Sequence, residues 1–267
     1  MLDLIVVFGY AGHVSRSYPG GKSGSGVFQR IISQMPPHEH YVEPFLGGGA
    51  VMRHKRPARS NLGIDLDGAA VQRAAVLAAA DEWISWPYEG LAGYPSDFVS
   101  WEWLNVDAVE WLKTWSPPAS TLVYCDPPYL METRSSQRRM YRYELSDDRH
   151  WELLDVLVKL PALVMISGYE SQLYSDRLSS WRVMQYRTMT RGGRMADECL
   201  WCNFPEPVEL HDYRYLGRDF RERERIRRKQ ARWVARLSAM TVLERRSVES
   251  ALLEVRARER TSQEAQG

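Results

Sequence analysis

A chain of 267 residues is long enough to bury one large core, alone or with a smaller appendage. Its formal net charge is +1, so any affinity for nucleic acid must come from local basic patches. Three cysteines exclude a disulfide framework, and the apolar opening at residues 4–8 is too short for a bilayer span and lacks the basic lead-in of a signal peptide. We therefore expect a cytoplasmic protein with no membrane partner.

The first glycine-dense segment covers residues 17–26 and precedes a helical pattern at Val27, Phe28, Ile31 and Ile32. Glycines there let a ligand approach the backbone closely, and the start of the helix offers free N–H groups to an anionic or carboxylate ligand. The segment predicts a ligand-binding turn.

A second glycine turn, at residues 47–49, follows a predicted strand that begins at Tyr41. Another short strand, ending in Asp65, arrives roughly 20 residues later, the spacing at which an acidic side chain accepts hydrogen bonds from ribose hydroxyls. Asp65 and Asp67 are also suited to capping the alanine-rich helix expected over residues 68–81. Both roles are compatible.

Residues 83–105 are rich in Trp, Tyr, Pro and Gly and show no clean period. We expect an irregular segment, either a substrate-facing insertion or an aromatic pad packed on the sheet. Residues 105–112 then predict a strand end carrying Asp107, followed by a short helix. In a nucleoside site, a carboxylate at Asp107 is placed to meet an adenine ring.

The stretch from Thr121 to Leu130 is the most informative one. It predicts a buried strand to Cys125 that ends in Asp126-Pro127-Pro128-Tyr129, and ligands of open α/β sheets bind at such carboxyl ends. The prolines hold one carbonyl in a fixed direction, and an ionised Asp126 only accepts hydrogen bonds. Two acceptors beside an aromatic face suit a nucleobase amine. The structural alternative is a strand-ending Asp followed by a proline turn.

Basic residues interleave with tyrosines in the loop at 131–143, a mixture suited to phosphate neutralisation and base stacking; a solvated loop is the alternative. A helix capped by Ser146 follows. Strands are then expected at 162–167, 181–187 and 198–204, with an arginine- and glycine-rich connection at 187–194 that suits nucleic-acid backbone contacts. The candidate nucleic-acid-binding residues are Arg134, Arg138, Arg139, Arg142, Arg191 and Arg194.

Cys199 and Cys202 have the CxxC spacing of a zinc or redox pair. They fall in a predicted strand, where positions i and i+3 face opposite sides, and no second pair exists. We expect no metal site there. From Tyr213 onward the composition changes to a strongly basic helix and a second amphipathic helix, which are either solvated faces or phosphate-binding surfaces.

Three motifs in order resemble the D12-class, Dam-like adenine-N6 DNA methyltransferases: residues 18–22 (YPGGK), 43–49 (EPFLGGG) and 126–129 (DPPY). The match spans residues 17–204, and the tail resembles an extension of phage and prophage members. The resemblance implies an α/β, Rossmann-like sheet with helices on both faces that binds S-adenosylmethionine and methylates a flipped-out adenine. It implies cofactor contacts at Tyr18, Lys22, Phe45, Gly47, Gly49, Asp65, Asp107 and Asp126.

In the chemistry that this resemblance implies, Asp126 and the Pro127 carbonyl accept both hydrogens of the adenine amine, which directs the nitrogen lone pair at the donor's methyl group. Pro128 and Tyr129 complete the catalytic turn, with Tyr129 stacking on the flipped base. A cytosine-C5 enzyme would need a thiolate nucleophile, and Cys125 precedes the turn. Cytosine-N4 methylation, RNA adenine methylation and a non-catalytic nucleic-acid-binding protein stay open.

One departure from the longer relatives concerns target recognition. They carry a substantial region between the ribose Asp and the catalytic strand, whereas this chain has only residues 68–120 there. Recognition is then minimal or carried by segments at about 83–105, 131–143 and 187–194 and by the tail. We expect a catalytic domain over 1–212 and a basic helical tail over 213–267, acting on DNA as a monomer or weak dimer. The target sequence and any partner restriction enzyme stay open.

Overall fold

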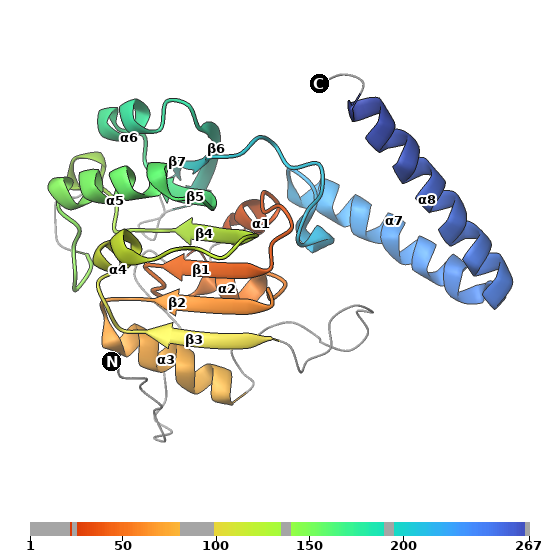
Figure 1. The fold of residues 1–267 in the computed structure, drawn as a ribbon, viewed down its shortest axis with the longest axis horizontal. Helices are drawn as coiled ribbons and strands as arrows, with labels where there is room; N and C mark the ends of the chain where they lie inside the picture. Colours follow the sequence, from red (N-terminus) through yellow and green to blue (C-terminus); the bar gives the residue numbers. More distant parts are fainter. Residues whose placement is uncertain (1–21, 23–25, 81–98, 135–139, 190–194, 265–267) are drawn as a thin grey trace. The chain divides into compact units, whose positions relative to one another are not determined.

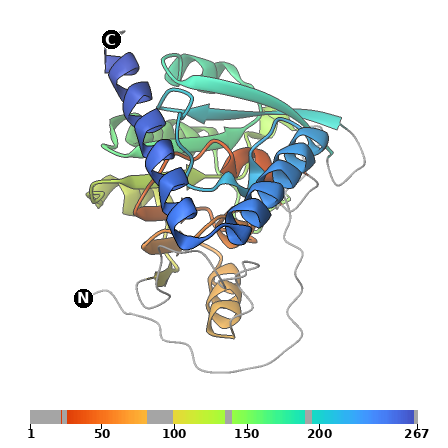
Figure 2. The same cartoon turned by 90° about the vertical axis from the view of Figure 1, so that its right-hand side faces the viewer.

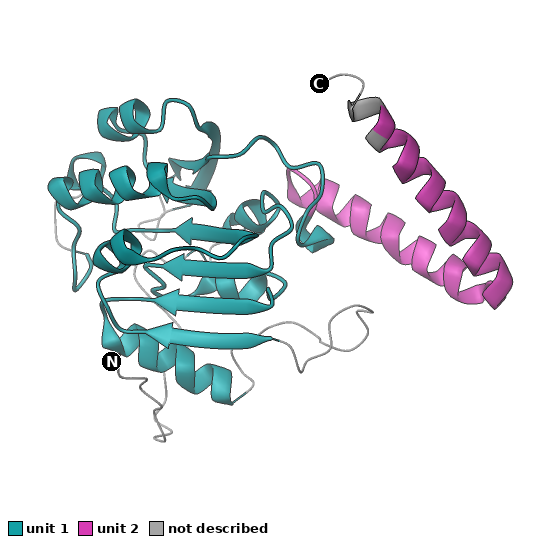
Figure 3. Ribbon diagram, viewed as in Figure 1, with its two compact units in different colours: residues 1–215 teal, residues 216–267 magenta. Residues whose placement is uncertain are grey.

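The computed structural model describes residues 22, 26–80, 99–134, 140–189 and 195–264. The chain separates into two compact units, residues 1–215 and residues 216–267 (Figure 3). The first unit carries all the predicted motifs, and each unit is described by itself.

The first unit is built on a seven-stranded sheet in the order β3-β2-β1-β4-β5-β7-β6 (Figure 1). Strands β1 to β5 run parallel, and β7 is antiparallel to both of its neighbours. The first five follow the doubly wound α/β order, so the expected fold class is confirmed. The strands are β1 (His40–Pro44), β2 (Ser60–Ile64), β3 (Ser100–Leu104), β4 (Thr121–Cys125), β5 (Leu163–Gly168), β6 (Arg182–Met189) and β7 (Met195–Cys202).

Helices cover both faces of this sheet, each over its own apolar cluster. One face holds α1 (Val27–Ile32), α2 (Ala50–His54) and α3 (Gly68–Ala79). The other holds α4 (Ala108–Thr114), α5 (Asp147–Lys159) and α6 (Gln172–Arg177). Because both faces are covered, the central strand β4 is buried at every position, which is why its residues from Leu122 to Cys125 form a continuous apolar run. Short 3₁₀ turns lie at Met131–Thr133 and Tyr213–Tyr215.

Strand β3 corrects the expectation of an irregular segment over residues 83–105. Trp101 and Trp103 alternate with Ser100, Glu102 and Leu104 and stack on each other with ring centroids 6.1 Å apart. The period-two pattern covers only five residues, and the surrounding aromatic composition hides it. The part of the segment before residue 99 lies outside the described residues.

The second unit consists of α7 (Phe220–Ala239) and α8 (Val242–Glu264). The two helices meet near Met240 and diverge from that turn in both views (Figure 2). Asp219 caps α7, because its carboxylate accepts a hydrogen bond from the Glu222 amide at 2.8 Å. No helix within the described residues is long and apolar enough to cross a membrane.

Candidate active site at the carboxyl edge of the sheet

The sheet order places two of the predicted motifs side by side. Strands β1 and β4 are adjacent and parallel, paired from His40–Thr121 to Val42–Val123. The chain leaves β1 toward β2 on one side, while β4 continues toward β5 on the other, so the order reverses between them. Ligands of open α/β sheets bind at the carboxyl ends of the strands at such a switch point. The turns after Pro44 and after Cys125 both lie there.

The turn after β1 has an unusual backbone. Phe45 has a φ of 61°, and Gly47 and Gly49 have φ values of 51° and 57°. A positive φ is costly for a residue with a Cβ, and such strain clusters at ligand sites. Asp65, at the end of β2, holds this turn: its carboxylate accepts the Gly47 amide at 2.7 Å and the Asp67 amide at 2.8 Å. Burial raises the pKa of Asp65, although both amide contacts oppose the rise.

A cavity of about 70 Å³, partly open to solvent, lies between the two turns. Its mainly apolar wall with a few carboxylates is typical of small-molecule sites. Gly49 and Lys22, both predicted cofactor contacts, are not part of the wall. The lining residues are Phe45, Gly47, Asp65, Leu66, Asp107, Ala108, Asp126, Pro128, Tyr141, Tyr143, Glu144 and Leu145.

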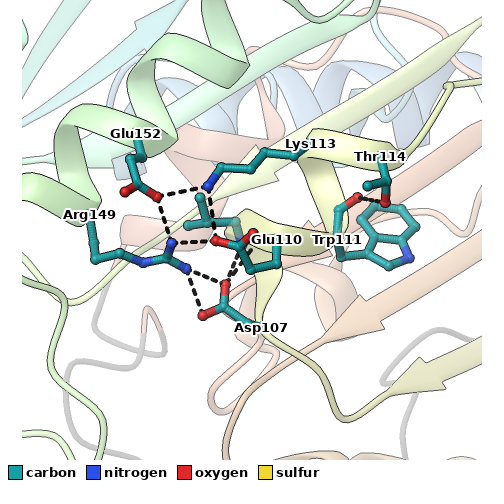
Figure 4. Close-up of polar contacts among 8 residues, drawn as sticks. Asp107, Glu110, Trp111, Lys113, Thr114, Arg149 and Glu152 are labelled. Atoms are coloured by element: carbon teal, nitrogen blue, oxygen red, sulfur yellow. Dashed lines mark hydrogen bonds and ion pairs between the residues drawn. The ribbon is translucent and has the colours of Figure 1, made fainter.

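Asp107 reaches the cavity from the start of α4 and is already heavily engaged (Figure 4). One of its oxygens caps the helix by accepting the Val109 and Glu110 amides. Arg149 on α5 donates to both oxygens, at 2.6 and 2.7 Å. Arg149 also contacts Glu110 and Glu152, so a cluster of charges joins α4 to α5. The sequence singled out Asp107 without indicating this arginine partner.

Lys22 connects the first predicted motif to the Asp126 turn. Its ammonium lies 2.9 Å from an Asp126 carboxylate oxygen and 3.2 Å from one of Glu198, and it donates a hydrogen bond to the Tyr129 hydroxyl. The Lys22 side chain is only 6% exposed, so these contacts are made away from solvent. Residues 18–22, predicted as one motif, contribute this lysine; Tyr18 lies outside the described residues.

Glu198 on β7 completes the cluster, and the sequence did not indicate it. Its carboxylate accepts hydrogen bonds from Tyr129 at 3.1 Å, Tyr186 at 3.4 Å and Thr188 at 3.1 Å, in addition to Lys22. A glutamate inside a buried strand was the available signal, because buried carboxylates need partners. The pairing itself depends on β7 lying next to β5.

The pKa shifts in this cluster follow from burial and from Lys22. Burial raises the pKa of Asp126, while the Lys22 ammonium opposes the rise. Burial acts in the same direction on Glu198, but Lys22 together with the hydrogen bonds from Thr188 and Tyr129 outweighs it, and the pKa of Glu198 is lowered. Burial tends to lower the pKa of Lys22, and Asp126 and Glu198 together raise it. Lys22 therefore stays protonated between the two carboxylates.

The tyrosines near the Asp126 turn fall into two groups, one packed beside Asp126 and one lining the cavity. The Tyr129 ring lies edge-on to Tyr169, with centroids 4.7 Å apart, while its hydroxyl also donates to Asp126 at 3.3 Å. Tyr141 and Tyr143, the tyrosines of the predicted basic loop at 131–143, line the cavity. Burial raises the pKa of Tyr141 to about 12, which reflects its apolar surroundings.

Arg134 corrects one expectation. It was predicted to contact nucleic acid, but its side chain is 5% exposed and donates to Glu144 at 2.6 Å and to the Tyr129 carbonyl at 2.7 Å. It thus holds the turn at residues 126–129 and offers little charge to a phosphate. Arg142, in contrast, is 70% exposed, with a contact of 3.5 Å to Asp67. The other predicted nucleic-acid contacts, Arg138, Arg139, Arg191 and Arg194, lie outside the described residues.

Glu43, from the 43–49 motif, faces the core rather than the cavity. It accepts a hydrogen bond from the Tyr41 hydroxyl at 2.7 Å, and burial raises its pKa to about 8. All three cysteines are free and buried, with Cys199 and Cys202 in β7. Across the described residues, no group of three or more His, Cys, Asp or Glu side chains is arranged to hold a metal ion.

No protein-family model and no curated protein matches the chain. Among solved structures, the 23S rRNA methyltransferase ErmE is 11% identical, with a TM-score of 0.39 and 70% of each chain covered. A dimethyladenosine transferase from Plasmodium falciparum is 10% identical, with a TM-score of 0.40, 66% of this chain and 58% of that chain covered. A SAM-dependent methyltransferase from Methanosarcina mazei is 9% identical, with a TM-score of 0.41 and coverages of 65% and 95%. With identities and TM-scores this low, only the site's own residues bear on its chemistry.

Proposed function

We propose that this protein transfers a methyl group from S-adenosylmethionine to the exocyclic N6 amine of adenine in DNA. The observation that carries the proposal is the position of Asp126 and Pro128, which follow β4 at the switch point and line the same cavity as Phe45, Gly47 and Asp65. An amine-accepting turn and a nucleoside-type turn thus share one cavity.

The residues present fit the cofactor. The positive-φ turn at Phe45 and Gly47 and the buried Asp65 carboxylate suit a ribose, and the apolar wall at Leu66 and Tyr141 suits an adenine ring. Asp107 would meet that ring while keeping its contact with Arg149. When bound, S-adenosylmethionine supplies an electrophilic methyl group on a sulfonium.

Asp126 would act directly on the target amine. The amine is a poor nucleophile because its lone pair is delocalised into the ring, and acceptors for both N–H hydrogens favour a pyramidal nitrogen. Asp126 and the Pro127 carbonyl provide these acceptors and stabilise the positive charge that develops on nitrogen. With the amine held by Asp126 and the Pro127 carbonyl, its nitrogen would accept the methyl group, the leaving thioether would keep the electron pair of the broken carbon–sulfur bond, and one amine proton would pass to solvent.

Lys22 and Glu198 would support this exchange. The Lys22 ammonium contacts the Asp126 carboxylate, which is also the proposed acceptor for the target amine. Glu198 also pairs with the Lys22 ammonium. Lys22 therefore keeps a carboxylate partner when the target amine donates a hydrogen bond to Asp126. Tyr129, held by its hydroxyl, presents its ring for stacking, which offsets part of the few kcal/mol that base flipping costs.

The proposal is tested with labelled S-adenosylmethionine and adenine-containing DNA or RNA. We expect label on DNA adenine N6, and Asp126→Ala should abolish transfer because the amine loses its charged acceptor. Lys159→Gln, at an exposed residue of α5 that pairs with Asp155, leaves the Lys22 cluster intact; it is the control and should keep the transfer step. If only RNA is labelled, the substrate is RNA and the proposal for DNA is wrong. Absence of transfer with both nucleic acids, or substantial activity of Asp126→Ala in folded protein, would refute the proposed reaction.

A further inference from the structure

Helix α7 carries a row of cations on one face. In a helix of 3.6 residues per turn, six of its basic positions fall within an arc of about 100° and extend over about 22 Å. All six side chains are exposed. We call this row the α7 basic stripe, and its members are Arg221, Arg225, Arg228, Lys229, Arg232 and Arg236.

Most of this charge is not neutralised within the protein. The two glutamates of α7 contact one member of the stripe between them. Glu224 pairs with Arg227 at 2.7 Å, outside the stripe, and Glu222 pairs with Arg218, also outside it, and with Arg225 of the stripe at 3.4 Å. In the described part of the chain, the centre of the stripe at 228, 229 and 232 has no acidic side chain within ion-pair distance. A solvated helix gains nothing from gathering like charges on one face, since neighbouring cations repel.

The charge is also segregated within the second unit. Helix α8 has equal numbers of arginine and glutamate, whereas α7 has eight basic residues against two glutamates. The whole chain has a net charge of only +1, so the stripe is a local feature rather than the result of a basic composition. α8 therefore provides a natural control for effects of general charge.

An extended row of exposed cations without a pocket fits a partner with repeating negative charges. The phosphates of a nucleic-acid backbone have this character, and neutralising them releases counterions. Trp233 is 47% exposed next to the row, with the Arg236 guanidinium 5.7 Å from its ring, and offers an aromatic surface of the kind that unpaired bases stack on. We infer that the α7 basic stripe binds the phosphate backbone of nucleic acid, independently of base sequence.

This binding goes beyond the proposed reaction and does not depend on it. It requires neither the cofactor nor Asp126, so an inactive protein should still bind. A stripe of this kind would hold the protein on its polymer substrate while the methyl-transfer site meets successive bases.

The test uses the full chain without cofactor and a fluorescent DNA duplex at several salt concentrations. The variant carries Arg228→Gln, Lys229→Gln and Arg232→Gln; the control removes three charges from α8 through Arg246→Gln, Arg256→Gln and Arg258→Gln. We expect the α7 variant to weaken binding by about 10-fold or more and to lower the slope of log K against log salt by about 2–3. The control should change the affinity by less than about 3-fold.

Circular dichroism of both variants checks that the helices persist. Equal effects of the two variants, or an unchanged salt slope for the α7 variant, would overturn the inference. Vesicles containing phosphatidylserine serve as the second probe, because a basic amphipathic helix also suits an anionic membrane. Stripe-dependent binding to vesicles with no stripe-dependent binding to DNA would overturn it as well. Asp126→Ala should bind DNA like the parent protein, which separates this result from failure of the methyl-transfer proposal.

Discussion

Glu198 is the residue for which the proposed chemistry predicts the most specific effect of a substitution. It shares Lys22 with Asp126 and also accepts the Tyr129 hydroxyl, yet it does not line the cavity. A buried carboxylate in this position is expected to position the reacting groups without touching the cofactor. Its effect should therefore fall on the transfer step rather than on cofactor binding.

We predict that Glu198→Gln lowers kcat by about 10-fold or more and leaves KM for S-adenosylmethionine nearly unchanged. The amide keeps the shape but removes a charge, so Lys22 is held more tightly by Asp126 and competes with the target amine. Single-turnover kinetics measure the rate of the methyl-transfer step. Asp197→Asn, on the same strand but exposed and paired only weakly with Arg187 at 3.5 Å, is the matched control and should behave like the parent. A rise in cofactor KM without a change in kcat would contradict the positioning role.

At the scale of elements, β2 and β3 pack so closely at Gly63 that adding one methyl group there should disturb the packing. A Cβ added at Gly63 would lie 2.8 Å from the Trp103 ring and 3.0 Å from Leu46. We predict that Gly63→Ala lowers the free energy of unfolding by about 1–3 kcal/mol, because the ring and the turn after β1 must both shift.

Gly68→Ala is the comparison for that substitution. Its Cβ would meet the end of the Asn105 side chain at 2.9 Å, and alanine is the better helix former by about 1 kcal/mol. We expect a net change within about 1 kcal/mol. Urea denaturation of both variants measures the difference. Equal losses would mean that the packing of Trp103 over β2 is looser than the structure describes.

The same elements explain how much could be predicted from the sequence. The turns at 43–49 and 126–129 were predictable because each is local in sequence and because parallel strands bring their carboxyl ends to one edge. Strand β3 was missed because five alternating residues were hidden among other aromatics. Glu198 was missed because its partners are set by β7 lying next to β5, a pairing between distant segments. Arg134 was misjudged because its charge gave no sign of the buried contact with Glu144.

At the scale of the whole molecule, the boundary between the two units depends on residues 211–215, a short segment that contacts the residues following α1 and α2. The chain separates after Tyr215, slightly beyond the expected end at 212. His211 stacks on His38 with centroids 3.8 Å apart, and its amide donates to the Met35 carbonyl at 2.9 Å. Asp212 accepts the Arg56 amide at 3.0 Å. These contacts make residues 211–215 part of the first unit.

We predict that a chain ending at Tyr215 unfolds cooperatively, with a free energy of unfolding within about 1 kcal/mol of that of the first unit in the full chain. A chain ending at Leu210 should lose about 2 kcal/mol or more, because it leaves buried backbone groups near Arg56 without partners and a cavity beside His38. Urea denaturation followed by tryptophan fluorescence compares the two. If the shorter chain is as stable as the longer one, the 211–215 segment is not part of the core. The chain ending at Tyr215 keeps Lys22, Asp126 and Glu198, so it should still transfer methyl groups while its DNA affinity becomes less sensitive to salt.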